Sequence, residues 1–315
     1  MCIRDSCYHC SSQEAEAQCR NTILHPLASL EWNEFTKLPF AISSCDKVQA
    51  VYVPHDQHGR LYISAGEDLY FWRTNPDDSR WRGPHNFPKK LGLFRYALAA
   101  YHSSLALVGG WSRVTKCSDQ VWILSASSSG CKLLPSQMLT KRSSAVAVGD
   151  EDYLAVAGGR NEEEEFLTVV EVYNGTQWMV VQPLPKSLRG ITSVLHDGIW
   201  YLMEEVDHEG AIYYFSLEKL VSSKDSAWKL LNSSLRSQSA PVSFDGQLLV
   251  TGRRWQHHCS IHTYSLITST WASIAPLENA DKIKSMIGLP GGQLMTVFSG
   301  NSAVKIATVK GMSTD

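Results

Sequence analysis

The 315-residue chain lacks any apolar run approaching the roughly 18 residues that a membrane-spanning helix requires, and its N-terminus lacks an apolar signal core. It also lacks an excess of either charge, since 29 Lys and Arg against 31 Asp and Glu leave a net charge of −2. This balance argues against a protein that coats nucleic acid or an anionic membrane. Few segments have the periodicity of a helix, although hydrophobic residues make up 43% of the chain. We therefore expect a globular protein that is not a helical bundle.

The cysteines have no paired spacing that would indicate a disulfide framework. Four of the eight lie within the first 19 residues, and the others are scattered: Cys2, Cys7, Cys10, Cys19, Cys45, Cys117, Cys131 and Cys259. With no signal peptide, this usage favours a reducing compartment, and we expect a cytoplasmic protein. Residues 1–20 are polar and without periodicity, so they are expected to form a disordered or unassigned tail before a single domain at 21–312.

Tryptophan is abundant, with 10 residues, and half of these recur at intervals of about 50 residues. Each opens a short segment, which after Trp32 and Trp178 runs into a Leu-Pro corner, and Cys131 takes the tryptophan place in one further copy; the five are Trp32, Trp81, Trp178, Trp228 and Trp271. A second landmark, an apolar strand that ends in glycine, recurs in phase at Gly110, Gly159 and Gly252, with weaker forms at Gly66, Glu204 and Gly300. Two features that share one period of this length predict the repeats of a propeller.

Each period has the pattern of four short strands. In the third copy these are expected at 143–148, 153–157, 167–173 and 178–181, separated by turn residues such as Asn174-Gly175. The first strand is made of small apolar residues, as expected beside a crowded central axis.

The glycine pair, a later aromatic residue (Tyr173, Tyr214 or Tyr264) and the tryptophan with its Leu-Pro corner together resemble the kelch repeat. The resemblance covers about residues 29–309. It implies an all-β, kelch-type β-propeller in which each repeat forms one blade of four antiparallel strands. Some copies depart from the pattern, with Ala65-Gly66, Glu204-Glu205 and Gly252-Arg253 where the glycine pair belongs.

The count of landmarks predicts six blades. The last glycine landmark is followed only by residues 303–309 before the chain ends, so that blade has no tryptophan strand of its own. Residues 30–38 form a tryptophan strand with no blade before it. We therefore expect a ring closed by the N-terminal strand, which completes the C-terminal blade.

Basic residues gather in the loops that this topology places on one face, those joining strands two and three and those joining consecutive blades. From these loops we predict a partner-binding face made of Arg95, Trp111, Arg113, Arg142, Arg160, Arg189, Arg236, Arg253, Arg254 and Trp255. Arginine suits carboxylates, so the predicted partner is an acidic peptide or protein segment. The opposite turns are rich in aspartate, which predicts a charge-polarised molecule.

Two alternatives stay open for this basic face. The arginines could instead be ordinary solvated residues or caps of blade corners. The four glutamates at 162–165 lie on the same face, where they could form a flexible, self-repelling loop or a guard over the basic rim.

A metal or cofactor is not expected. His257, His258, Cys259 and His262 alternate along a predicted strand, and no second ligand pair accompanies them. The sequence contains no P-loop, dinucleotide fingerprint or nucleophile elbow.

These features favour a non-catalytic protein–protein interaction module rather than an enzyme. Kelch propellers often serve as scaffolds or as substrate receptors of ubiquitin ligases, and the resemblance implies a role of that type. The alternative is a small-molecule enzyme or metal-dependent specifier that uses the central channel. A channel lined by small residues would favour the binding module, whereas clustered carboxylates and histidines would favour the enzyme.

Overall fold

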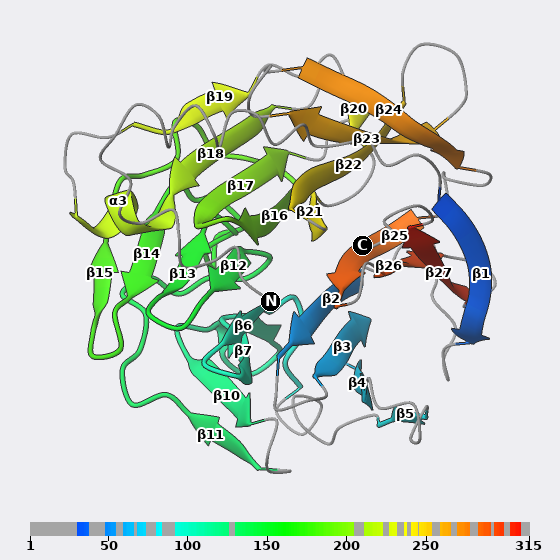
Figure 1. The fold of residues 1–315 in the computed structure, drawn as a ribbon. Coiled ribbons are helices and arrows are strands. Elements are labelled where there is room, and N and C mark those ends of the chain that lie inside the picture. The colour runs from blue at the N-terminus through cyan, green and yellow to red at the C-terminus, as the bar shows by residue number, and fades with distance from the viewer. Residues whose placement is uncertain are drawn as a thin grey trace, which may run out of the picture.

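The computed structural model describes residues 30–37, 48–54, 59–65, 68–73, 80–83, 92–125, 130–204, 211–222, 227–231, 236–237, 241–244, 246–253, 259–265, 270–277, 283–290, 293–298 and 303–309. These residues form antiparallel sheets arranged around a common centre (Figure 1). The predicted β-propeller is thus confirmed as the architecture.

Five of the described sheets have four strands each, in the blade form of a propeller. They consist of β2 (Val48–Val53), β3 (Arg60–Ala65), β4 (Asp68–Arg73) and β5 (Trp81–Arg82); β6 (Ala97–Tyr101), β7 (Ser104–Val108), β10 (Val121–Ser125) and β11 (Cys131–Leu133); β12 (Val146–Gly149), β13 (Leu154–Ala157), β14 (Val170–Tyr173) and β15 (Trp178–Val180); β16 (Ile191–His196), β17 (Ile199–Glu204), β18 (Ile212–Ser216) and β19 (Lys229–Leu231); and β25 (Ile283–Leu289), β26 (Gln293–Phe298), β27 (Ala303–Val309) and β1 (Leu30–Lys37).

A further sheet has five strands because two short strands, β20 (Arg236–Ser237) and β21 (Val242–Phe244), both pair with β22 (Gln247–Arg253). It continues through β23 (Cys259–Ser265) to β24 (Thr270–Leu277). Outside these sheets lie the hairpin of β8 (Trp111–Ser112) with β9 (Lys116–Cys117) and the short helix α3 (Leu217–Ser222). None of the helices in the described ranges has the length and apolar character needed to cross a membrane.

The two ends of the described chain lie in one sheet. Strand β1 pairs antiparallel with β27, from Leu30 opposite Val309 to Lys37 opposite Ala303. This is the pairing predicted from the unmatched tryptophan strand at the start of the sequence and the incomplete blade at its end.

The innermost strands of the sheets lie next to one another around the centre of Figure 1. Strand β2 neighbours β6 and β25, β12 neighbours β6 and β16, and β21 neighbours β16 and β25. These strands are rich in small residues, such as Ala97 and Ala99 in β6 and Ala147 in β12, which allow backbones to converge. Larger side chains fill the spaces between consecutive sheets, and Trp200 and Tyr201 of β17 are fully buried there.

Tryptophans that open the outermost strands pack between consecutive sheets, as predicted. The indole Nε1 of Trp178 donates a hydrogen bond to the Ser136 carbonyl, and that of Trp228 donates one to the Gln182 carbonyl, each at 3.2 Å. Both acceptors lie in the corner that precedes the tryptophan's own sheet. The repeated tryptophan therefore links one sheet to the corner leading into it.

The glycine pairs allow the next corner of the chain to approach closely. Gly159 has φ 91°, and a Cβ atom there would lie 2.6 Å from the Ser143 carbonyl oxygen. Gly109 has φ 63°, and its Cβ would lie 2.6 Å from the Arg142 carbonyl oxygen. Both the backbone conformation and the available space therefore require glycine at these positions.

Replacing Gly159 by alanine is expected to destabilise the protein by on the order of 2 kcal/mol more than replacing Gly175. Gly175 also has positive φ, at 88°, but nothing lies within 4 Å of its would-be Cβ. The loss of stability in the Gly175→Ala variant therefore measures the backbone strain alone. The additional loss in the Gly159→Ala variant measures the cost of the steric contact with the Ser143 carbonyl oxygen. Urea unfolding of both variants provides the comparison, and equal losses of stability would contradict this account of the glycine pair.

Candidate functional site

The loops predicted to share one face do lie side by side. Phe94, before β6, exchanges two backbone hydrogen bonds with Trp111 of the β8–β9 hairpin, at 2.9 and 2.7 Å. The Ser143 and Arg160 backbones form a second such pair, at 3.0 and 2.8 Å. The backbone N–H of Ser144 donates to the Arg95 carbonyl at 2.7 Å. The loops between sheets and those between second and third strands thus form one surface here.

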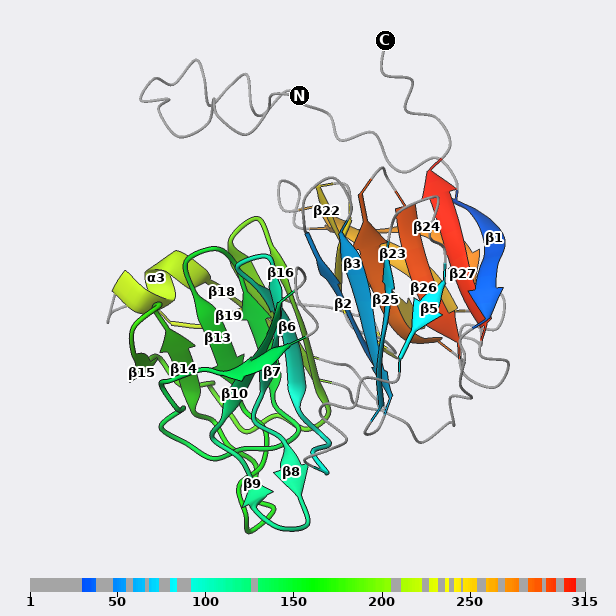
Figure 2. The ribbon, with the colours of Figure 1, turned by 90° about the horizontal axis from the view of Figure 1, so that it is seen from below.

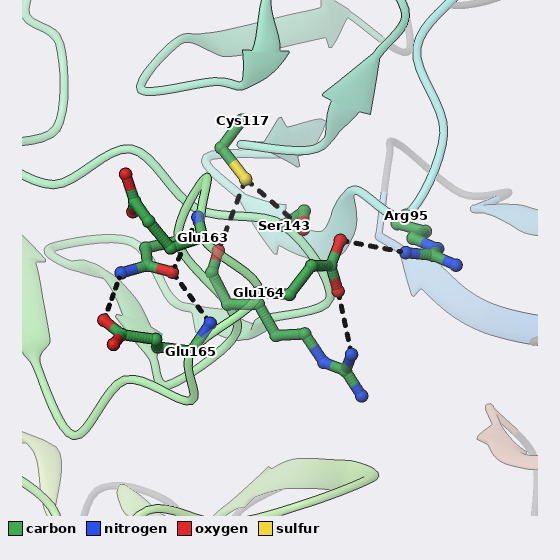
Figure 3. A network of polar contacts seen from close by, with 8 residues as sticks. Arg95, Cys117, Ser143, Glu163, Glu164 and Glu165 are labelled. Carbon is green, nitrogen blue, oxygen red and sulfur yellow. Dashed lines mark hydrogen bonds and ion pairs between the residues drawn. The ribbon is translucent and has the colours of Figure 1, made fainter.

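Arg95 and Arg160, from two different loops, face the same carboxylate. The Oε2 atom of Glu164 lies 2.8 Å from Nη1 of Arg160, and its Oε1 atom lies 3.8 Å from Nη1 of Arg95 (Figure 3). All three side chains are partly exposed, with 48% of that of Glu164 accessible to solvent. Arg95 and Arg160 are therefore placed where predicted, and a carboxylate already lies between them.

Aromatic rings lie against these arginines. The Arg160 guanidinium stacks 4.3 Å from the centre of the Phe166 ring, and that of Arg189 lies 5.2 Å from the same centre. The half-buried Trp111 packs against Phe94, with ring centres 4.8 Å apart. We refer to Phe94, Arg95, Trp111, Arg160, Phe166 and Arg189 as the arginine–aromatic cluster.

The β8–β9 hairpin projects from the body of the propeller beside this cluster (Figure 2). Arg113 is exposed near its tip, and the Val114 side chain is 92% exposed. An inner contact holds the hairpin in shape, because the Ser112 hydroxyl accepts a hydrogen bond from the Thr115 backbone N–H at 3.0 Å.

Arg142 does not belong to this surface, which corrects its prediction as a partner contact. Its side chain is 0% exposed and forms an ion pair with Glu171, which is also 0% exposed. Its Nη1 atom donates to the carbonyl oxygens of Gly158 and Val169, at 3.0 and 2.9 Å. Burial lowers the pKa of the Arg142 guanidinium, and the Glu171 carboxylate opposes that shift. Arg142 thus caps a blade corner from inside, the alternative left open by the sequence.

Glu171 also provides a hydrogen-bond acceptor for the loop that precedes its sheet, because its Oε2 atom accepts a hydrogen bond from the Leu139 backbone N–H. Glu204 does the same in the next sheet, accepting from the Arg189 backbone N–H at 3.2 Å and from Nζ of Lys186 at 2.8 Å. Glu204 stands where the repeat has a glycine, so this departure from the pattern has a structural role.

The remaining predicted contacts are only partly within the described residues. Arg236 and Arg253 lie opposite each other in the β20–β22 pair. Arg254 and Trp255 lie outside the described residues, as do His257 and His258. Within the described ranges, no group of three or more His, Cys, Asp or Glu residues is arranged to hold a metal ion.

Charge does not divide between the two faces as predicted. The glutamates of the acidic loop, residues 161–166, lie among the basic residues, and Glu162 pairs with Lys141 at 3.4 Å. On the side of the turns, Arg60 at the start of β3 lies opposite Arg73 at the end of β4. Among the residues that the structure describes, both faces therefore carry both charges.

A central cavity of about 650 Å³ opens between the innermost strands. Its described lining is mostly small and apolar, for example Ala50, Ala99 and Val194, with scattered hydroxyl and amide groups such as Ser193 and Ser243. No carboxylate or imidazole is among these lining residues.

His196 lies beside Ser243 in the interior, with its Nδ1 atom 2.8 Å from the Ser243 hydroxyl. Burial lowers the pKa of His196, while Asp197, 3.7 Å from Nε2, opposes the shift. Because protonation of this imidazole is easier in the unfolded chain, stability contributed by neutral His196 is lost as the pH falls below about 6.5.

The His196→Gln variant is therefore expected to lose less stability than the natural chain between about pH 7 and about pH 5. Glutamine keeps a polar partner for Ser243 and cannot take up a proton in this range. Unfolding in urea at both pH values measures the two losses. Equal losses in the two proteins would show that His196 does not contribute to the pH dependence.

Sequence reasoning missed Phe94, Phe166 and the bridging role of Glu164. Single aromatic residues in loops have no periodic signal, and their stacking on arginines depends on how loops of different blades meet. For Glu171, a signal was present, since a lone glutamate within the apolar strand 170–173 indicates a buried basic partner.

Comparison with known proteins supports the architecture. No family model matches the chain, and no curated protein matches it. Among solved structures, YjhT is similar with a TM-score of 0.60 and 14% sequence identity, over 87% of this chain and 96% of that chain. At this identity the likeness supports the β-propeller fold alone.

Proposed function

We propose that the chain is a non-catalytic interaction module that binds an acidic protein segment through its arginine–aromatic cluster. The observation that carries the proposal is the convergence of Arg95, Arg160 and Arg189, from three loops, with aromatic rings on one exposed surface. Arginine combines charge, planar hydrogen bonding and ring stacking, and it is enriched with aromatic residues in protein interfaces. The role would be that of a cytoplasmic scaffold or substrate receptor, as its resemblance to kelch proteins implies.

We further propose that the module is a six-bladed kelch-type propeller in which the β20–β24 sheet is the sixth blade. The contacts of the innermost strands support this arrangement, because β21 lies between β16 and β25. The pairing of β1 with β27 supports closure of the ring by the N-terminal strand. A closed ring would hold the loops of the cluster at fixed distances, which favours binding over a preformed surface.

Direct binding of a charged peptide tests the proposed function. A fluorescein-labelled oligoglutamate peptide is titrated with the protein at low and raised salt, and an oligolysine peptide of equal length serves as the charge control. We expect saturable binding of oligoglutamate that weakens as salt rises, and no comparable binding of oligolysine. Equal binding of both peptides, or of neither, would contradict the proposal.

The alternative is chemistry in the central cavity by a small-molecule enzyme or metal-dependent specifier. It predicts stoichiometric metal in the purified protein, which elemental analysis measures. The small apolar lining of the cavity gives this alternative no specific support.

A further inference from the structure

Glu164 occupies the part of the arginine–aromatic cluster where two arginines converge. Its carboxylate contacts Arg160 of the same loop at 2.8 Å and reaches Arg95 of the neighbouring loop at 3.8 Å, and Figure 3 shows Glu164 pointing toward Arg95. A glutamate or aspartate of an acidic partner would present the same chemical group to the same two guanidinium groups. The natural chain thus already supplies a carboxylate at this position.

The acidic loop is built to hold Glu164 there. The Oδ1 atom of Asn161 accepts hydrogen bonds from the backbone N–H groups of Glu163 and Glu165, at 3.1 and 2.8 Å. The Nδ2 atom of Asn161 donates to Glu165 at 2.9 Å, and the Glu164 N–H donates to the Asn161 carbonyl at 3.2 Å. Glu164 itself has φ 61°, a left-handed conformation that ordinary residues rarely adopt. The loop therefore holds this carboxylate over the arginines in an unfavourable backbone conformation.

The contacts of Glu164 are also weak enough to exchange. Both ion pairs are partly exposed, with about half of the side chain of Arg95 and somewhat more than a third of that of Arg160 in solvent. Exposed ion pairs of this kind contribute little to stability, because solvent screens the two charges. A partner that brings several carboxylates, and that also contacts the aromatic rings, can therefore displace a single glutamate.

We propose that the acidic loop is an internal competitor, in which Glu164 fills the subsite for an acidic side chain of the partner and is displaced when the partner binds. This inference rests on the proposed function and adds to it a built-in limit on affinity. The loop thereby raises the threshold for binding, so that segments with several acidic residues bind and isolated carboxylates do not.

The Glu164→Gln variant tests this inference, with Glu163→Gln as its matched control. Both variants remove one negative charge from the same loop, but Glu163 contributes its backbone N–H, not its carboxylate, to the described network. We expect Glu164→Gln to bind the oligoglutamate peptide roughly 3- to 10-fold more tightly than the natural chain, and Glu163→Gln to differ from it by less than about 2-fold.

The same substitution in an Arg160→Ala background separates competition at this site from a general charge effect. Since the closer arginine partner is then absent, the gain from Glu164→Gln is expected to shrink by at least about half. Thermal unfolding of each variant shows whether the fold is retained, and these exposed substitutions are expected to leave it intact.

Each outcome distinguishes the two proposals. Equal gains in Glu164→Gln and Glu163→Gln, or weaker binding by Glu164→Gln, would overturn the internal competitor and leave the binding function in place. Weaker binding by Glu164→Gln would mean that Glu164 instead orders the arginines for the partner. If neither the natural chain nor Glu164→Gln binds oligoglutamate, the proposed function fails and the inference fails with it.

Discussion

Replacing Arg142 by alanine is expected to lower the free energy of unfolding by about 3 to 5 kcal/mol. The variant leaves the Glu171 carboxylate buried without its cation and removes the donor to the Gly158 and Val169 carbonyls. An unpaired buried charge is costly because little solvent can reach it. Urea unfolding followed by tryptophan fluorescence measures the loss.

Two further variants make this prediction specific to the buried pair. Arg160→Ala removes an arginine that pairs with a glutamate at the surface, and it is expected to change stability by less than about 1 kcal/mol. Replacing both Arg142 and Glu171 by methionine is expected to recover only part of the loss: no unpaired charge remains, but the Leu139 N–H and the Gly158 and Val169 carbonyls lose these hydrogen-bond partners. A loss below about 1 kcal/mol for Arg142→Ala would contradict its assignment as a buried corner residue.

Reversing the charge of Arg160 and Arg189 together is expected to weaken binding of the oligoglutamate peptide by at least about 100-fold. Each substitution removes a favourable contact with the peptide and places a carboxylate where another carboxylate must bind. Both substitutions also remove a guanidinium that lies over the Phe166 ring. Fluorescence anisotropy at fixed salt measures the change in Kd.

The matched control reverses Arg80 and Lys132, two exposed residues before β5 and within β11. This variant has the same net charge as the Arg160→Glu, Arg189→Glu protein, so a general electrostatic effect would weaken binding equally in both. We expect a change of less than about 3-fold for the control. Similar losses in the two double variants would argue against a localised site.

The sequence predicted the architecture well because the repeating residues, tryptophan and glycine, have defined roles in packing the sheets together. Trp178 and Trp228 link each sheet to the preceding corner, and Gly109 and Gly159 permit the close approach of backbones. Most blades share these requirements, so the residues that meet them recur with the period of the fold. The meeting of the Arg95, Trp111 and Arg160 loops followed from the alternation of strand directions within each blade.

The composition of the candidate site was less predictable because it depends on how loops of different blades pack. Arg142 and Arg160 are both arginines close to the ends of strands, yet one is buried against Glu171 and the other is exposed. Nothing in the spacing of arginines separates these two environments. The position of Glu164 likewise depends on hydrogen bonds to Asn161 and on a positive φ angle. A charge count over the loops therefore predicted a basic face with an acidic run on it, but not which of these charges pair.

Photo-crosslinking locates the bound peptide on the protein and so shows whether the arginine–aromatic cluster is the binding site. An oligoglutamate peptide with a benzophenone group is crosslinked to the natural chain, and the modified residues are identified by mass spectrometry. We expect crosslinks only at the segments that carry Phe94 and Arg95, Trp111, residues 160–166 and Arg189, and we expect excess unlabelled peptide to suppress them. Saturable crosslinks at the central cavity or at the turns on the opposite face, with none at these segments, would contradict this binding site.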